Sequence, residues 1–251
     1  MDTLVDIRGL TKYFGPVKAV EDVSFSVKRG EVLGFLGPNG AGKSTTMKML
    51  AGYLIPTAGS ASICGFDVGK QTIEVQRRLG YLPEGAPAYG DLTPIGLFRF
   101  AAGLRGITGA DRERKIRTSI ERLELQSVAQ RPIETLSKGF KRRVSLAQSI
   151  LHDPEVLILD EPTDGLDPNQ KHQVRTLLQQ MARDKAIIIS THILEEVDAV
   201  CTRAIIIGNG RLLADARPRE LEARSTYHNA VVMKMPSADA DKAERALTGM
   251  A

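Results

Sequence analysis

The stretch Gly37-Pro38-Asn39-Gly40-Ala41-Gly42-Lys43-Ser44-Thr45 decides the fold of this chain, because it matches the phosphate-binding loop pattern of nucleotide-binding proteins. An apolar segment, residues 31–36, precedes it, and a segment with helical periodicity, residues 43–51, follows it. Small residues let consecutive backbone N–H groups turn toward a phosphate, and the N-terminus of the following helix adds partial positive charge. The alternative is a glycine-rich turn that binds nothing, and the strand–loop–helix context argues against it.

Two side chains of this loop carry specific chemistry. Lys43 would reach the β- and γ-phosphates of a nucleotide, and the Ser44 hydroxyl would ligate Mg²⁺. The other residues of the loop would surround the phosphates, and they are Gly37, Pro38, Asn39, Gly40, Ala41, Gly42 and Thr45.

Two acids end a second apolar segment, residues 156–159. Asp160 would hold Mg²⁺ directly or through water, and Glu161 could orient or deprotonate an attacking water. Acids at this position could also form a helix cap or a solvated turn, and Pro162 favours a turn in any case. Together with the phosphate-binding loop, however, the pair indicates nucleotide hydrolysis.

The pattern along the chain predicts an α/β fold. Apolar residues alternate with polar ones around Val5 and Ile7 and again over residues 23–27, with a turn at residues 14–16, which indicates an N-terminal antiparallel β subdomain. Residues 94–125 have helical periodicity, broken near residues 106–109, and resemble an inserted α-helical subdomain.

Downstream of that insertion, strands and helices alternate, which predicts a P-loop NTPase core with a mainly parallel sheet and helices on both faces. The expected strands are residues 156–159, 186–190 and 203–207, and the expected helices are residues 139–151, 169–182 and 194–200.

Composition restricts the class of protein. The hydrophobic share is 42% and the charged share 25%, which are ordinary values for a soluble globular protein, and the net charge of +4 does not distinguish among anionic partners. No apolar run approaches the roughly 18 residues that a membrane-spanning helix needs. The acids Asp2 and Asp6 stand where a secretory signal carries positive charge. We expect a cytosolic protein.

The order of these motifs resembles an ABC transporter ATPase over residues 3 to about 224. Leu136-Ser137-Lys138-Gly139-Phe140 is similar to the family signature Leu-Ser-Gly-Gly-Gln. The resemblance implies that Ser137 and Gly139 contact the γ-phosphate of ATP held by a second subunit. Taken alone, Ser137 could equally be a plain helix N-cap. Lys138 and Phe140 depart from the family's usual Gly and Gln.

Other positions extend the resemblance. It implies that Tyr13 stacks on adenine, although an ordinary strand aromatic is the alternative, and that His192 contacts the γ-phosphate as a third catalytic group beside Glu161 and Lys43. Residues 165–167 are similar to a dimer-interface loop, with Asp164 where Ser or Ala is commoner. Glu84 stands where the family usually has a metal-contacting Gln, so the expected metal ligands are Ser44, Glu84 and Asp160.

Two other functions are compatible with a phosphate-binding loop. A DNA-repair or chromosome-organising ATPase would carry a long heptad insertion between the two nucleotide motifs, and this chain has none. A non-enzymatic nucleotide-binding module should lack either Glu161 or the signature. Arg142 and its neighbours Lys141 and Arg143 follow the signature, where a nearby phosphate is sufficient explanation, and no nucleic acid is expected.

The resemblance implies an ATP-binding and ATP-hydrolysing subunit of an ABC transporter, most similar to bacterial ABC-2-type exporters. It would work with Mg²⁺ as a homodimer on separate integral membrane permease subunits, at the cytoplasmic face of the cell membrane. We expect residues 1–224 to form the ATPase domain, with its helical subdomain at about residues 90–150. Residues 225–251 would begin a small accessory region that the end of the sequence truncates.

Overall fold

The computed structural model describes residues 2–85 and 89–223. The chain divides into two compact units, Met1–Pro218 and Arg219–Ala251. A short helix, α8 (Pro218–Ala223), begins at this division. The strand and helix predicted beyond residue 224 lie outside the described residues, so the accessory region stays a prediction.

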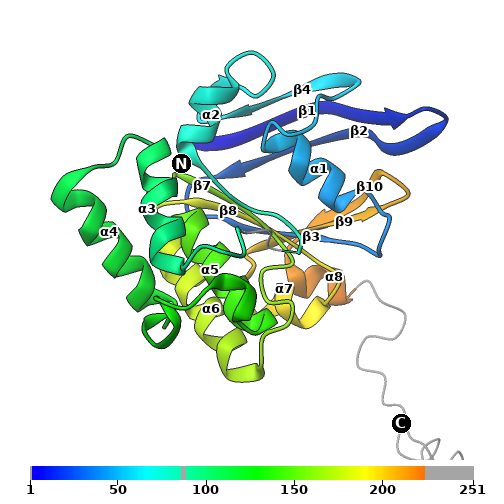
Figure 1. Cartoon of the computed structure of the whole chain (residues 1–251). Helices are drawn as coiled ribbons and strands as arrows, with labels where there is room; N and C mark the ends of the chain where they lie inside the picture. Colours follow the sequence, from blue (N-terminus) through cyan, green and yellow to red (C-terminus); the bar gives the residue numbers. More distant parts are fainter. Residues whose placement is uncertain (1, 86–88, 224–251) are drawn as a thin grey trace, which may run out of the picture. The chain divides into compact units, whose positions relative to one another are not determined.

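The first unit opens with an antiparallel sheet of four strands in the order β2-β1-β4-β5 (Figure 1). Its long hairpin pairs Val5 with Val27 and Ile7 with Phe25, so the alternating apolar residues lie on one face. The strands are β1 (Thr3–Phe14), β2 (Val17–Lys28), β4 (Ala58–Ile63) and β5 (Phe66–Asp67). The predicted antiparallel N-terminal subdomain is confirmed. The two strands β4 and β5 were not predicted, because β4 consists largely of small residues without an apolar alternation and β5 has only two residues.

The second sheet has the order β10-β9-β3-β8-β7-β6, and all of its neighbouring strands are parallel except β10 and β9. Because parallel strands end at one edge, the carboxyl ends of β3, β8 and β7 meet there. The strands are β3 (Val32–Leu36), β6 (Leu79–Leu82), β7 (Val156–Asp160), β8 (Ala186–Thr191), β9 (Arg203–Gly208) and β10 (Arg211–Ala216). The mainly parallel P-loop NTPase sheet is confirmed.

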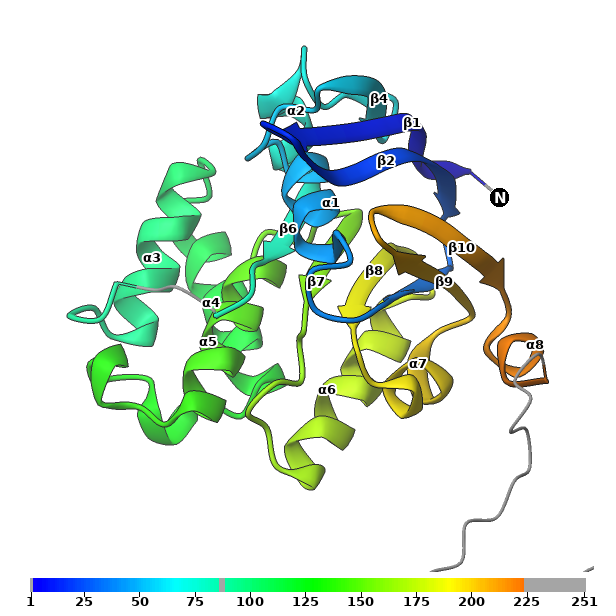
Figure 2. The same ribbon diagram turned by 90° about the vertical axis from the view of Figure 1, so that its right-hand side faces the viewer.

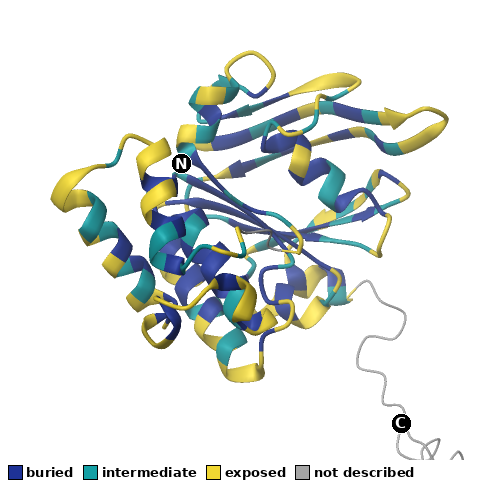
Figure 3. Cartoon of the chain, viewed as in Figure 1, coloured by how far each residue is buried: buried dark blue, intermediate teal, exposed yellow. Residues whose placement is uncertain are grey.

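Two hydrophobic cores cover the two faces of this parallel sheet (Figure 3). In β7, Val156 and Ile158 pack with the N-terminal sheet and α1 (Lys43–Leu50), whereas Leu157 and Leu159 pack with the helices. Figure 2 shows α1 between the two sheets. Successive side chains of a strand point to opposite faces, so a strand covered on both sides must be apolar throughout.

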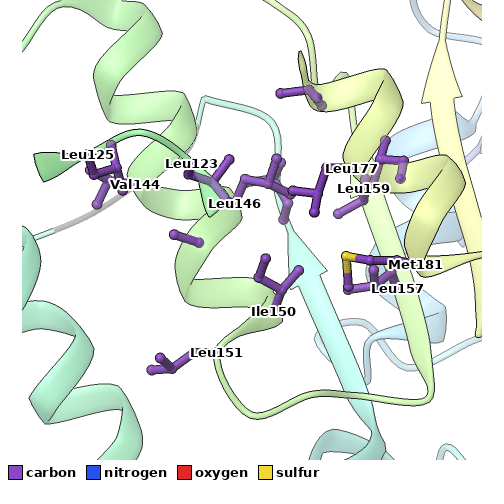
Figure 4. Close-up of a cluster of buried hydrophobic side chains, with 14 of the residues drawn as sticks. Leu123, Leu125, Val144, Leu146, Ile150, Leu151, Leu157, Leu159, Leu177 and Met181 are labelled. Carbon is purple, nitrogen blue, oxygen red and sulfur yellow. The ribbon is translucent and has the colours of Figure 1, made fainter. Parts of the chain in front are cut away.

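The inserted helical subdomain packs on the core that contains Leu157 and Leu159, and Figure 4 shows Leu146 and Ile150 of this subdomain on the side toward β7. The helical structure is interrupted between α3 and α4, as predicted, and Gly106 and Gly109 have φ of 71° and 60° there. Thr93 caps α3 by accepting a hydrogen bond from the Gly96 N–H at 3.1 Å. The helices here are α3 (Pro94–Leu104), α4 (Gly109–Arg122), the 3₁₀ turns η1 (Gln126–Val128) and η2 (Ile133–Thr135), and α5 (Lys138–Ile150).

The remaining helices are α2 (Thr72–Arg78), α6 (Pro168–Met181) and α7 (Leu194–Val200). Asp167 caps α6, its Oδ1 accepting from the Gln170 N–H at 2.9 Å. Within residues 2–85 and 89–223, no helix is long and apolar enough to cross a membrane.

The loop that carries Glu84 follows a strand, because residues 79–82 form β6 and pair with β7. Gly80 lets α5 pack closely against this strand, since a Cβ there would lie 2.2 Å from the Ser149 carbonyl oxygen. Pro83, Glu84 and Gly85 follow the strand as a loop.

Candidate nucleotide-binding and catalytic site

The phosphate-binding loop connects β3 to α1 at the carboxyl edge of the parallel sheet. Gly40 and Gly42 have φ of 81° and 105°, a left-handed backbone that other residues adopt only at a cost. A Cβ on Gly42 would lie 2.5 Å from the Ala19 carbonyl oxygen, and one on Gly37 would lie 2.4 Å from the Ile207 carbonyl oxygen. The glycines are therefore required by both conformation and packing, which favours the predicted loop over an incidental turn.

Lys43, at the start of α1, is only 6% exposed. Its Nζ donates to the carbonyl oxygens of Gly37 at 2.6 Å and Pro38 at 3.2 Å, so the ammonium group lies inside the curve of the loop. The loop encloses a cavity of about 370 Å³. The residues lining it are Ala19, Pro38, Asn39, Gly40, Gly42, Lys43, Ser44, Thr45, Glu84 and Glu161. The fold thus brings the predicted base and the predicted phosphate-binding loop to one cavity.

Asp160 ends β7 with a side chain that is 1% exposed. Its Oδ1 accepts a hydrogen bond from Ser190 of the neighbouring strand β8. Its Oδ2 is buried and has no hydrogen-bond partner among the described residues. Buried carboxylate oxygens are nearly always paired, so an orphan at this place is a suitable ligand for a cation or for a water bound to one.

Glu161 leaves the strand in a left-handed conformation, with φ of 51°. A left-handed backbone costs about 1 kcal/mol or more for a non-glycine residue. The Glu161 N–H donates to the Ser190 carbonyl oxygen at 3.1 Å, and this hydrogen bond helps to hold the conformation. Its Oε1 lies 2.9 Å from Nδ1 of His192, which follows β8. The Glu161 side chain is 15% exposed and lines the cavity, whereas that of His192 is 54% exposed and is not among the lining residues. The structure brings together these two residues, which are far apart in the sequence.

Arg142, in α5, has a role that the sequence did not reveal. Its buried guanidinium donates to the carbonyl oxygens of Asp160 and Glu161 and, at 2.9 Å, to that of Pro83. Desolvation lowers its pKa from the ordinary value. The neighbouring Arg143 is also buried and donates to the Leu123 carbonyl oxygen at 3.1 Å. The explanation of these arginines by a nearby phosphate is therefore wrong: Arg142 joins the signature helix to the loops that carry Glu161 and Glu84.

The signature lies at the N-terminus of α5 and contributes no residue to the lining of the phosphate-loop cavity. The Ser137 Oγ caps the helix, accepting from the Phe140 N–H at 3.4 Å. The capping oxygen acts as an acceptor, so the hydroxyl proton remains available to a ligand. A Cβ on Gly139 would lie 3.2 Å from the Gly165 carbonyl oxygen, so glycine here leaves room for the backbone of the loop that follows Glu161.

Two departures from the family pattern turn out to be partners. The Lys138 Nζ lies 2.9 Å from Asp164 Oδ2, although both side chains are exposed. The hydrogen bond from Lys138 holds the pKa of Asp164 below its ordinary value. A Cβ on Gly165 would lie 2.8 Å from the Lys138 Cδ, so the lysine stem lies over this glycine. Lys138 and Asp164 replace the usual pair of small residues with an ion pair between the signature and the expected dimer-interface loop.

Tyr13 lies at the end of β1 and is not among the residues lining the phosphate-loop cavity. Its side chain is 38% exposed, and the Lys18 Nζ lies 5.8 Å from the ring centroid. Glu84 does line the cavity, together with Glu161. Nevertheless, among the described residues no group of three or more His, Cys, Asp or Glu could hold a metal ion. A three-acid metal cage of Glu84, Asp160 and Glu161 is therefore not formed by the protein alone.

Comparison with known proteins identifies the family. The ABC transporter family model matches residues 20–164. The chain is 38% identical over 225 residues to the probable multidrug ABC transporter ATP-binding protein YbhF of Escherichia coli, covering 89% of this chain and 39% of that protein. It is 36% identical over 219 residues to Nod factor export ATP-binding protein I of Ralstonia nicotianae, covering 87% of this chain and 68% of that protein.

A solved structure described as the ATP binding subunit of an ABC transporter superimposes with a TM-score of 0.82 at 30% identity, covering 98% of this chain and 99% of that one. The chain thus spans well under half the length of its YbhF relative, but nearly the whole length of this solved subunit. The matched residues include the phosphate-binding loop, the signature and the Asp160–Glu161 pair. The chain belongs to the ABC transporter family, as one of its ATP-binding cassettes.

Proposed function

We propose that this protein is the ATP-binding and ATP-hydrolysing subunit of an ABC transporter that exports its cargo. The observation that carries the proposal is the single cavity shared by Lys43, Ser44 and Glu161. An anion-binding loop that faces a carboxylate base across one cavity has the parts needed to bind a nucleotide and hydrolyse it. Export is the activity printed in the name of the Ralstonia relative, and it is carried to this chain as part of the proposal.

In the proposed reaction, Glu161 accepts a proton from the water that attacks the γ-phosphorus, and the bond to the ADP oxygen breaks. His192, paired with Glu161 at 2.9 Å, orients this carboxylate and hydrogen-bonds the γ-phosphate. Lys43 neutralises charge on the β- and γ-phosphates. Tyr13 would stack on the adenine beyond the cavity rather than inside it.

The residues present fit Mg²⁺, because the Ser44 hydroxyl lines the phosphate-loop cavity together with Glu161, and the buried Oδ2 of the adjacent Asp160 has no hydrogen-bond partner among the described residues. Mg²⁺ keeps several waters and takes the rest of its ligands from one or two protein groups and the phosphates. When bound, the metal would neutralise phosphate charge. Ser44 and Asp160 would hold it, and Glu84, which lines the same cavity as Ser44, would be a third ligand.

Replacing Glu84 with glutamine tests this third ligand. We expect the Mg²⁺ concentration for half-maximal ATPase activity to rise about threefold, because a carboxylate attracts the metal more strongly than an amide does. ATP affinity measured in EDTA should improve, since one negative charge facing the phosphates is removed. Superimposable Mg²⁺ titrations of the two proteins, with equal ATP affinity in EDTA, would mean that Glu84 only shapes the loop.

The active unit would be a dimer in which each subunit completes the site of the other. This part of the proposal is supported by the position of Ser137 and Gly139, which lie outside the cavity formed by their own phosphate-binding loop. The N-terminus of α5 offers N–H groups and a hydroxyl to an anion. A second copy placed head to tail would bring those donors to the γ-phosphate.

Replacing Ser137 with arginine should leave ATP binding by the monomer intact and lower ATPase activity at least about fivefold, because overpacking a close contact costs at least about 1 kcal/mol. ATP affinity by isothermal titration and activity over a range of protein concentrations are the measurements. Ser127→Arg introduces the same side chain at an exposed position of the helical subdomain and serves as the control. Activity that survives Ser137→Arg and does not depend on protein concentration would argue against shared sites.

Integral membrane subunits would dock on the side of the molecule that carries a second cavity, of about 460 Å³. Tyr53, 71% exposed, borders it, and its ring centroid lies 5.5 Å from that of Tyr81. An exposed aromatic beside a mixed polar and apolar cleft is typical of a protein-binding surface. The protein would then lie at the cytoplasmic face of the membrane, in contact with those subunits.

The direct test is hydrolysis of Mg-ATP by the purified protein, followed as phosphate release. Saturable activity that requires Mg²⁺ supports the proposal, and co-purification with a membrane subunit from the native host would support the transporter assignment. Failure to bind ATP would overturn the proposal as a whole.

A further inference from the structure

A buried carboxylate behind the site, Glu196 of α7, connects two separate loops. The residue is 6% exposed. Its Oε1 accepts hydrogen bonds from Thr163 Oγ1 at 2.6 Å and from Lys171 Nζ at 3.0 Å, and its Oε2 accepts one from Thr191 Oγ1 at 3.0 Å. Both threonines are themselves buried, at 5% and 1% exposure. The four side chains form one closed polar cluster, separate from the residues that line the phosphate-loop cavity.

The two threonines adjoin the predicted catalytic pair. Thr163 follows Glu161 by two residues in the loop after β7, and Thr191 immediately precedes His192 at the end of β8. The Thr191 Oγ1 also accepts from the Ile193 N–H at 3.1 Å, which orders the backbone on the other side of His192. The contact between Glu161 and His192 thus depends on how these two loops are held relative to each other.

The cluster requires an ionised carboxylate. Burial alone would raise the pKa of Glu196, but the hydrogen bonds from Thr163 and Lys171, the charge of Lys171 and the hydrogen bond from Thr191 outweigh it, and the pKa lies below its ordinary value. An ionised carboxylate accepts from all three donors at once, whereas an amide must present N–H groups to at least one of them.

We propose that Glu196 is a positioning residue, which sets the pairing of Glu161 with His192 by fixing the loops that carry them. The inference rests on the proposed ATPase function and adds to it a residue without contact to the nucleotide cavity. Because catalysis by a positioned base falls steeply with small displacements, loosening the two loops should slow hydrolysis without weakening nucleotide binding.

Replacing Glu196 with glutamine keeps the shape of the side chain and mismatches one hydrogen bond. We expect kcat at saturating Mg-ATP to fall about tenfold, while the Kd for ATP changes less than about twofold. The exposed neighbour offers a matched control, since Glu195→Gln makes the same chemical change one residue away and should keep the wild-type kcat. A thermal melt shows whether each variant is folded.

Combining Glu196→Gln with His192→Ala separates positioning from general loosening. If Glu196 acts through the Glu161–His192 pair, the Glu196→Gln substitution should lower kcat by no more than about twofold in the His192→Ala background. The effects of the two substitutions are then coupled. A double variant whose kcat falls by the product of the two single-variant losses would overturn the inference. An unchanged kcat in Glu196→Gln would also overturn it.

A second variant decides the question if Glu196→Gln does not fold. Thr163→Val is nearly isosteric and removes one hydrogen bond from the cluster, so a loss of a few-fold in kcat with unchanged ATP affinity is expected, and an unchanged kcat overturns the inference. These outcomes are distinct from failure of the proposed function, in which the wild-type protein itself would not hydrolyse ATP.

Discussion

The Glu161→Gln protein is expected to bind ATP as the wild type does, to hydrolyse it at least about a hundredfold more slowly, and to accumulate as an ATP-bound dimer. The amide keeps the size of the carboxylate but does not accept a proton from the attacking water. Its Oε1 can still meet the His192 Nδ1, which lies 2.9 Å from Glu161 in the wild type, so the local packing should persist. In the proposed dimer, the nucleotide would then stay in place and keep the two subunits joined.

Phosphate release at saturating Mg-ATP gives the rate, and size-exclusion chromatography with Mg-ATP shows the dimer. Glu195→Gln, at an exposed position, controls for the loss of one negative charge. A Glu161→Gln protein that stays monomeric and hydrolyses ATP at the wild-type rate would show that Glu161 is not the base.

Replacing Lys43 with alanine is expected to raise the Kd for ATP roughly 10- to 150-fold, which corresponds to losing about 1.5–3 kcal/mol for a hydrogen bond to a charged group. The lysine is 6% exposed, and its ammonium group lies within the curve of the phosphate-binding loop. No substitute cation lines that cavity among the described residues. The phosphates would therefore lose their nearest positive side chain.

Isothermal titration calorimetry with ATP measures the effect. Lys70→Ala removes the same charge from an exposed position outside the site and should leave the affinity unchanged. Because Lys43 also donates to two loop carbonyls, circular dichroism and a thermal melt should accompany the titration. An unchanged ATP affinity in folded Lys43→Ala would rule out the assignment of the phosphate-binding loop.

Sequence reasoning predicted those parts of the fold whose signal is local. The alternation in β1 and β2, the apolar runs of β7 and β8 and the break between α3 and α4 each follow from residues within a short window. Strands β4, β5, β6 and β10 were not predicted. They are short or lack an apolar pattern, and β6 is a strand because β7 lies beside it, with Gly80 allowing close packing against α5.

The sequence by itself determined the nucleotide-binding loop, the acids that end β7 and the family. These are motifs in which neighbouring residues act together, so their spacing along the chain is also their spacing in space. The tertiary structure alone revealed the ion pair of Lys138 with Asp164, the carbonyl contacts of Arg142 and the cluster around Glu196. Each joins segments far apart in the chain, and a buried charge has a role only through the partners that the fold supplies.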